Sequence, residues 1–136
     1  DTGTKLTHIG DNTTSNIVSY GVALDASNQT FRSLVSFTGN NCSNASKCDS
    51  RIIGNRATAN TLPRIIHSGQ NNKQSHEATT GTIDTATLNY LNMAGIDTDT
   101  AIALIIGATA TPVLSRLPME FLVESKQLIQ MALSKD

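Results

Sequence analysis

The chain has 136 residues, of which 38% are hydrophobic, and a formal net charge of −1 at pH 7. This length is enough for one domain with a buried core. The near-neutral charge argues against a surface for nucleic acid or an anionic membrane. The longest strongly apolar stretch, residues 101–110, has about half the length that a membrane span needs.

The chain opens at Asp1-Thr2-Gly3, without Met and without the charged and apolar regions of a signal peptide. We therefore expect a fragment or processed piece of a longer protein. Its two cysteines, Cys42 and Cys48, allow three interpretations: a disulfide, half of a zinc site, or reduced thiols. Reduced intracellular thiols fit best, because the sequence has no secretion signal and no second cysteine pair.

The first part of the chain, to about Gly81, is rich in Thr, Ser, Asn and Gly and predicts β-strands. Four β-prone runs cover residues 16–20, 30–37, 50–53 and 63–66. Alternation in the second run predicts one strand face that carries Phe31, Ser33, Val35 and Phe37. Turn signals follow the runs: Gly21, Gly39-Asn40-Asn41, Gly54-Asn55 and Ser68-Gly69.

Pairs of bulky aliphatic residues recur along these runs, at Ile17-Val18, Leu34-Val35, Ile52-Ile53 and Ile65-Ile66. A loose period of about 20 residues with short strands is typical of the rungs of a parallel β-helix. An irregular β-sandwich, whose strands recur at shorter intervals, is the alternative.

From Ile83 the pattern becomes helical. Asp84 and Asp97 can cap two helices, with Gly95 after the first and Pro112 limiting the second. Pro118 suits the first turn of a third helix. The apolar positions expected to face a core are Leu88, Leu91, Ala101, Ile102, Ile105, Ile106, Phe121, Leu122, Leu128 and Ile129. Strands followed by helices predict a β-dominated α+β fold with parts 1–82 and 83–136.

Candidate chemistry centres on Cys48 and the adjacent pair His76-Glu77. The chain has no Gly-rich phosphate loop, no H-E-x-x-H and no G-x-S-x-G motif, which argues against an ATPase, a zinc protease or a serine hydrolase. Residues one or two rungs apart in a β-helix stack closely, so Cys48 can meet His76-Glu77. The three side chains could bind a transition metal, could be a nucleophile with its base and orienter, or could be unrelated surface residues.

Several segments carry a family resemblance. Three of them follow one another in the order and at the spacing of the SufB/SufD family of iron–sulfur cluster assembly scaffolds. They are Lys47-Cys48-Asp49-Ser50, Ser75-His76-Glu77-Ala78-Thr79-Thr80 and Leu117-Pro118-Met119-Glu120-Phe121. The resemblance covers essentially the whole chain and is to the family's C-terminal part. It is closer to SufB, because SufD normally lacks the cysteine and has His-Gly where this chain has His76-Glu77.

The resemblance implies a right-handed parallel β-helix followed by a C-terminal helical domain that docks an ATPase. It implies a scaffold and not an enzyme, in the cytoplasm or, for a plastid-bearing source, the plastid stroma. Cys48 would accept sulfur from a donor protein, and Cys48, His76 and Glu77 would hold a nascent, transient iron–sulfur cluster. ATP would act only through a SufC-type ABC ATPase, whose docking site maps to Leu117, Pro118, Met119, Glu120, Phe121 and Glu124.

Three departures from the family pattern reduce the number of possible cluster ligands within one chain. Ala57 stands where the family often has a cysteine, Asn60 where it often has a histidine, and Ser75 where it often has an acidic residue. The remaining ligands would then come from a SufD-type subunit or a second SufB-type copy at a dimer interface. The alternative is a SufD-like subunit that supplies only an interface histidine. Lys47 and Arg51 flank Cys48 and could lower its pKa, or could form only a solvated basic pair.

Overall fold

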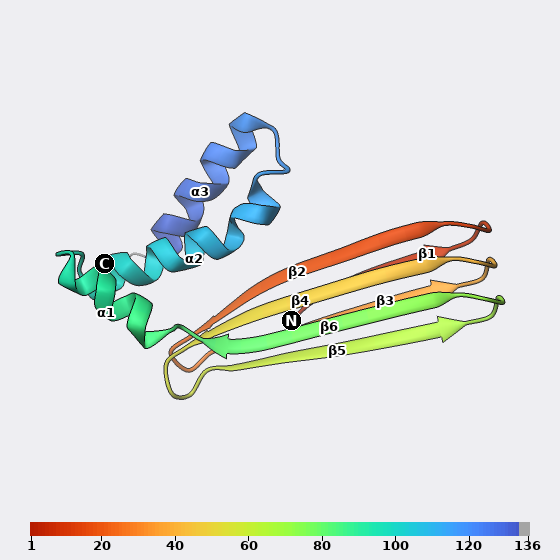
Figure 1. Cartoon of the computed structure of the whole chain (residues 1–136), viewed down its shortest axis with the longest axis horizontal. Helices are drawn as coiled ribbons and strands as arrows, with labels where there is room; N and C mark the ends of the chain where they lie inside the picture. Colours follow the sequence, from red (N-terminus) through yellow and green to blue (C-terminus); the bar gives the residue numbers. More distant parts are fainter. Residues whose placement is uncertain (134–136) are drawn as a thin grey trace. The chain divides into compact units, whose positions relative to one another are not determined.

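A computed structural model describes residues 1–133 of the chain, which form two compact units, Asp1–Gly81 and the part from Thr82 onward (Figure 1). The first unit holds the strands β1 (Thr2–His8), β2 (Thr14–Leu24), β3 (Asn28–Phe37), β4 (Ser43–Ile53), β5 (Thr58–His67) and β6 (Lys73–Thr82). The second holds the helices α1 (Thr85–Met93), α2 (Thr98–Leu114) and α3 (Met119–Leu133). None of these helices is long and apolar enough to cross a membrane.

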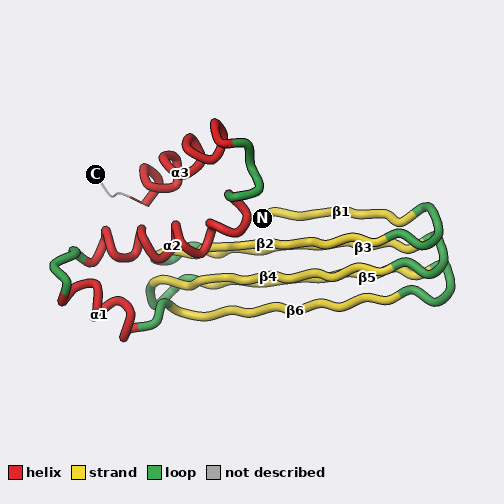
Figure 2. Tube along the Cα trace, turned by 45° about the horizontal axis from the view of Figure 1, so that its top comes forward, coloured by secondary structure: helices red, strands yellow, loops and turns green. Residues whose placement is uncertain are grey.

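The strands form two parallel sheets that the chain visits alternately. One sheet has the order β1-β3-β5 and the other β2-β4-β6 (Figure 2). Each pair of consecutive strands, β1–β2, β3–β4 and β5–β6, is one circuit of the coil, which we call the first, second and third rung. The fold is therefore a β-rich, β-helix-like coil with parallel sheets, followed by helices, as the order of sequence patterns predicts.

The rung length differs from the predicted period of about 20 residues. Thr2 pairs with Phe31, 29 positions later, and Asn28 pairs with Thr58, 30 positions later. The prediction was wrong because the recurring aliphatic pairs lie on successive strands, which alternate between the two sheets. These pairs are Ile17-Val18, Leu34-Val35, Ile52-Ile53 and Ile65-Ile66. Their spacing measures the step from one strand to the next, which is only about half a rung.

The strands are also longer than the β-prone runs. β1, β6 and the first half of β4 were not predicted, and Gly21 lies within β2 and not in a turn. The side-chain amide of Gln29 packs against Gly21, 2.0 Å from where a Cβ would lie, so a larger residue there would displace this amide. The other predicted turns, at Gly39, Gly54 and Ser68-Gly69, do separate strands.

The core of the first unit combines an apolar sheet with a polar one. The predicted inward face of β3 is confirmed, since Phe31, Ser33, Val35 and Phe37 are all buried. The ring of Phe37 stacks between His8 and His67, with centroids 4.8 and 4.9 Å away. Facing them, the inward residues of β4 are Asn44, Ser46, Cys48 and Ser50.

The helices begin where the sequence predicts. Asp84 accepts hydrogen bonds from the backbone N–H groups of Ala86 and Thr87, and Asp97 from that of Thr100. These bonds, with those from the hydroxyls of Thr87 and Thr100, hold the pKa of both caps below its ordinary value.

Two details of the helices differ from expectation. Pro112 does not end α2, which continues to Leu114, because losing one backbone donor this close to the last turn removes only a single hydrogen bond. Of the predicted core positions in α3, Phe121 and Leu128 are exposed while Leu122 and Ile129 are half-buried.

Candidate functional site

Cys48 lies in the middle of β4. Along β4 buried and less buried residues alternate, and Cys48 belongs to the buried set, with 3% of its surface exposed. It faces the core among Ile17, Val35 and Phe37, beside Ser19 of the first rung in the strand register. Burial raises the pKa of the Cys48 thiol, because a thiolate would lose its hydration there.

The flanking cations do not act on this thiol as the sequence suggested. Lys47 lies on the outer face of β4, and its Nζ is 3.6 Å from Oε1 of Glu77. Arg51 donates to Asp49 at 3.2 Å, also on the outer face. Because consecutive strand residues point to opposite faces, neither cation approaches the thiol, and of the two interpretations that the sequence left open, the lowering of the Cys48 pKa is excluded.

His76 lies in β6 and shares the inner face with Cys48. The backbone N–H of Lys73 donates to the carbonyl of Cys42, which continues the 30-residue register from β4 to β6. Gln74 Nε2 then donates to the inward-facing Ser46 Oγ, so His76, two residues further along β6, also points inward. Both of its ring nitrogens are shielded from solvent and have no hydrogen-bond partner within the described residues.

Glu77 points to the other side of the sheet. It follows His76 directly in the strand, and its ion pair with Lys47 lies among exposed side chains of the outer face. The strand alternation that separates His76 from Glu77 also separates Glu77 from Cys48. Glu77 therefore does not share a face with the thiol.

Of the three predicted site residues, two share a face. Cys48 and His76 lie on the inner face of neighbouring strands, whereas Glu77 lies outside. Within residues 1–133 no group of three or more His, Cys, Asp and Glu side chains is arranged to hold a metal ion. A nucleophile, base and orienter in the manner of a cysteine hydrolase is likewise not assembled around Cys48.

Cys42, which directly precedes β4, is a second buried thiol. Both cysteines are free, and six residues of extended strand separate them by roughly 20 Å, which excludes a disulfide or a shared zinc site. Cys42 Sγ accepts a hydrogen bond from Thr13 Oγ1 at 3.2 Å and donates to the carbonyl of Gly10 at 3.2 Å.

The polar interior beside these thiols was missed by the sequence analysis. His8 bonds through one ring nitrogen to Thr13 and through the other to Ser15, and Ser15 accepts from Asn44 Nδ2 at 2.8 Å. Asn44 Oδ1 accepts from Ser46, which in turn accepts from Gln74. A hydrogen-bonded chain thus leads from Cys42 to the neighbourhood of His76. The 29-residue spacing of Thr13 and Cys42, and of Ser15 and Asn44, was the signal that could have revealed it.

The residues predicted to dock an ATPase all lie on the surface of the second unit. Pro118 directly precedes α3, and Leu117, Met119 and Phe121 are 39%, 79% and 56% exposed. Glu120 and Glu124 are exposed as well. Exposed apolar side chains at this density are typical of a protein-binding surface.

Comparison with known proteins places the chain among iron–sulfur assembly proteins. The family described as SUF system FeS cluster assembly, SufBD core domain, matches residues 1–109. An iron–sulfur cluster assembly SufBD family protein of Synechocystis sp. is 39% identical over 135 residues, which are 98% of this chain and 28% of that protein. SufBD family proteins of Pyropia yezoensis and Arabidopsis thaliana, the latter described as chloroplastic, are also 39% identical over 98% of the chain.

The chain spans only about a quarter of these relatives, 28% of the Pyropia protein and 24% of the Arabidopsis protein. The family match nevertheless covers most of the chain, including both candidate inner-face residues. The family resemblance predicted from the sequence motifs is therefore confirmed, and the chain belongs to the SufBD family of iron–sulfur cluster assembly proteins.

Proposed function

We propose that this chain is a SufB-like part of a scaffold for new iron–sulfur clusters, in which Cys48 accepts sulfur and a nascent cluster is held at a dimer interface. The observation that carries the proposal is the inner-face pair of Cys48 and His76 in neighbouring strands. A thiol and an imidazole are both ligands for iron, and an incomplete protein ligand set suits a cluster that has to leave again.

Of the two proposed ligands, His76 is the one whose donor atoms lack hydrogen-bond partners within the described residues. Its ring nitrogens are buried and unpartnered, which is costly for an imidazole unless a ligand or partner completes it. Cys48 is held as a protonated thiol by burial, so sulfur transfer requires the thiol to be uncovered and ionised first. Movement of the third rung relative to the second would uncover it.

The third rung is suited to contact a second chain. β5 and β6 are the last strands of their sheets, and Leu62, Ile65 and Ile66 are 47%, 40% and 38% exposed. A SufD-type subunit or a second copy that adds a strand along β6 would reach both His76 on the inner face and Glu77 on the outer face. In this arrangement Glu77 would contribute to the cluster at the interface and not within one chain.

The second unit would dock a SufC-type ABC ATPase through the exposed surface from Leu117 to Glu124. ATP would then be used by the partner and not by this chain, which itself catalyses no reaction. The location in the cytoplasm, or in the plastid stroma of a plastid-bearing source, belongs to the same proposal.

The test is reconstitution of the protein, expressed at the full length of its gene, with its ATPase, iron and sulfide under anaerobic conditions. We expect Cys48→Ala to abolish cluster assembly and transfer, and Cys42→Ala, which removes the other buried thiol of the first unit, to leave both largely intact. If Cys48→Ala assembles and transfers clusters as well as the wild type, the central role of Cys48 is wrong.

A SufD-like subunit is the second candidate, and the orphaned ring of His76 beside a protonated Cys48 favours it. Such a subunit would position the ATPase and supply only an interface histidine. Loss of activity in His76→Ala, together with full activity in Cys48→Ala and Glu77→Ala, would support this function over the first.

A further inference from the structure

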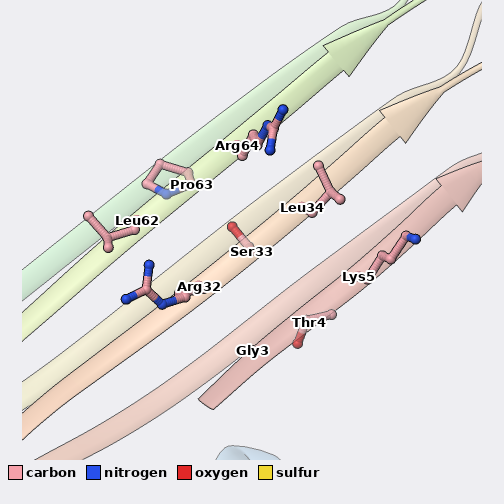
Figure 3. Close-up of a pocket in the computed structure, with 9 residues that line it drawn as sticks. All are labelled: Gly3, Thr4, Lys5, Arg32, Ser33, Leu34, Leu62, Pro63 and Arg64. Carbon is pink, nitrogen blue, oxygen red and sulfur yellow. The ribbon is translucent and has the colours of Figure 1, made fainter. Parts of the chain in front are cut away.

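The outer face of the β1-β3-β5 sheet carries an open groove that lies away from Cys48 and His76. Its volume is about 720 Å³, and it crosses all three strands. Figure 3 shows the side chains that line it. Strand register arranges them in two rows, Gly3, Arg32 and Leu62 in one and Lys5, Leu34 and Arg64 in the other.

Gly3 opens one corner of this groove. A Cβ at this position would lie 2.9 Å from the carbonyl oxygen of Arg32, so the backbone forms the floor there. The neighbouring strands carry longer side chains, which form the walls. The result is a shallow, extended depression and not an enclosed cavity.

The groove is positively charged. Lys5, Arg32 and Arg64 line it, and none of its nine lining residues is acidic (Figure 3). At the spacing of a sheet the three cations stand about 8–10 Å apart around Leu34. Within the described residues Lys5 and Arg64 form no ion pair.

Arg32 already binds a carboxylate at this face. Its Nε donates to Asp1 Oδ2 at 3.0 Å and to Oδ1 at 3.2 Å, and both side chains are more than half exposed. This contact shows that the guanidinium is presented in a geometry that accepts a carboxylate. The exposure of the pair means that a second carboxylate can compete with Asp1.

The spacing identifies the kind of ligand. Three cations whose backbone positions lie about 8–10 Å apart around an apolar residue favour an extended ligand with several charges, and an extended peptide places side chains on one side about 7 Å apart. That repeat matches the distance between the two rows. Carboxylates of such a peptide would meet the cations, and its apolar side chains would cover Leu34 and Leu62.

We propose that this groove docks an acidic segment of a partner protein in which carboxylate and aliphatic side chains alternate. The surface lies on the opposite sheet from Cys48 and His76, so it does not depend on their role, although Leu62 also belongs to the third-rung surface of the proposed function. The charges supply orientation and association rate, and the leucines supply the apolar area that is buried.

The experiment measures binding of a fluorescein-labelled peptide of alternating Glu and Leu to the protein expressed at the full length of its gene. We expect saturable binding that weakens with salt and falls about tenfold or more when Lys5, Arg32 and Arg64 are all changed to Gln. Lys73→Gln, which removes an exposed cation outside the groove, is the matched control and should leave binding unchanged. Asp1→Asn should tighten binding, because it releases Arg32.

Equal binding by the triple variant and the wild type would overturn the proposal. So would equal binding of a peptide of alternating Gln and Leu, or binding of phosphatidylglycerol vesicles but not of the acidic peptide. If the triple variant does not fold, the single variant Arg64→Gln decides the question, because its exposed side chain has no partner to lose and a smaller loss of peptide affinity is expected.

Discussion

At the scale of single residues, the alternation of β4 and β6 controls the candidate chemistry. Lys47 and Glu77 meet on the outer face, and Cys48 and His76 share the inner one. A residue pair that is adjacent in sequence, His76-Glu77, is thereby divided between two environments. The thiol is protected and protonated, while the carboxylate is solvated and already paired with a lysine.

The ionisation of Cys48 gives a prediction with a definite sign. Burial raises its pKa in the folded chain, so the protonated thiol stabilises the fold at pH values below the pKa of an unfolded cysteine. That stability is lost as the pH rises through the pKa of the folded state. In a Cys42→Ala background, the rate of alkylation by iodoacetamide should therefore rise with pH at a higher midpoint in the native chain than in denaturant.

The denatured sample is the internal control, because it contains the same single thiol in water. A native midpoint below the denatured one would contradict the prediction. It would mean that a cation or a hydrogen bond to the thiolate outweighs burial, as the flanking Lys47 and Arg51 first suggested.

At the scale of structural elements, the corner between the two strands of each rung is repeated in the sequence. Asn12, Asn41 and Asn71 occupy it with φ of 58°, 54° and 55°. Asparagine tolerates this left-handed conformation better than most residues. Side-chain carbonyls link the corners, since Asp11 accepts from the backbone N–H of Asn40, and Asn40 from that of Gln70.

Gly39 makes the close stacking of these corners possible. A Cβ there would lie 2.2 Å from the carbonyl oxygen of Gly10, and one at Gly69 would lie 2.0 Å from that of Gly39. Because both atoms belong to backbone, they can move only by separating the rungs. We expect Gly39→Ala to lower the free energy of unfolding by roughly 1–3 kcal/mol, as measured by urea denaturation.

The same substitution at Gly107 is the control, since nothing lies within 4 Å of a Cβ there and the residue is inside α2. Alanine should stabilise that helix by about 0.5–1 kcal/mol. A Gly39→Ala variant as stable as the wild type would show that the corners do not stack as tightly as described.

At the scale of the whole molecule, the sequence predicted the change from strands to helices, the helix caps and the inward face of β3. It did so because those features depend on local patterns: apolar alternation in β3, and an aspartate before each of α1 and α2. Such local patterns did not reveal the rung length, β6 or the first half of β4. Their inward residues are Asn44, Ser46 and Gln74, which pair with other rungs and carry no apolar alternation.

The candidate site, like the fold, was predictable only in part. Cys48 and His76 lie on one face of neighbouring strands, while their joint role in a site stays a prediction. The exclusion of Glu77 from that face follows from the strand register, which a sequence without a known rung length does not specify. The burial that raises the Cys48 pKa likewise depends on Ile17, Val35 and Phe37 from two other strands.

The coil as a whole should be unevenly stable. The second rung is paired on both sides, and its strands β3 and β4 contribute Phe31, Val35, Phe37 and Cys48 to the core. The third rung is paired on one side only, and no residue of β5 or β6 is buried. In a solenoid each rung is stabilised by its neighbours, so amide hydrogen exchange should be slowest in β3 and β4 and markedly faster in β5 and β6.

Hydrogen exchange measured with the partner chain present distinguishes amides that are protected within this chain from amides that the partner protects. If a second chain pairs along β6, protection should rise in β5 and β6 and stay unchanged in β3 and β4, whose amides are already covered. Equal protection of all three rungs in the isolated chain would contradict the nearest-neighbour argument. Protection that the partner raises only in the helices would move the interface away from the third rung, and with it the shared cluster site that Cys48 and His76 are proposed to form.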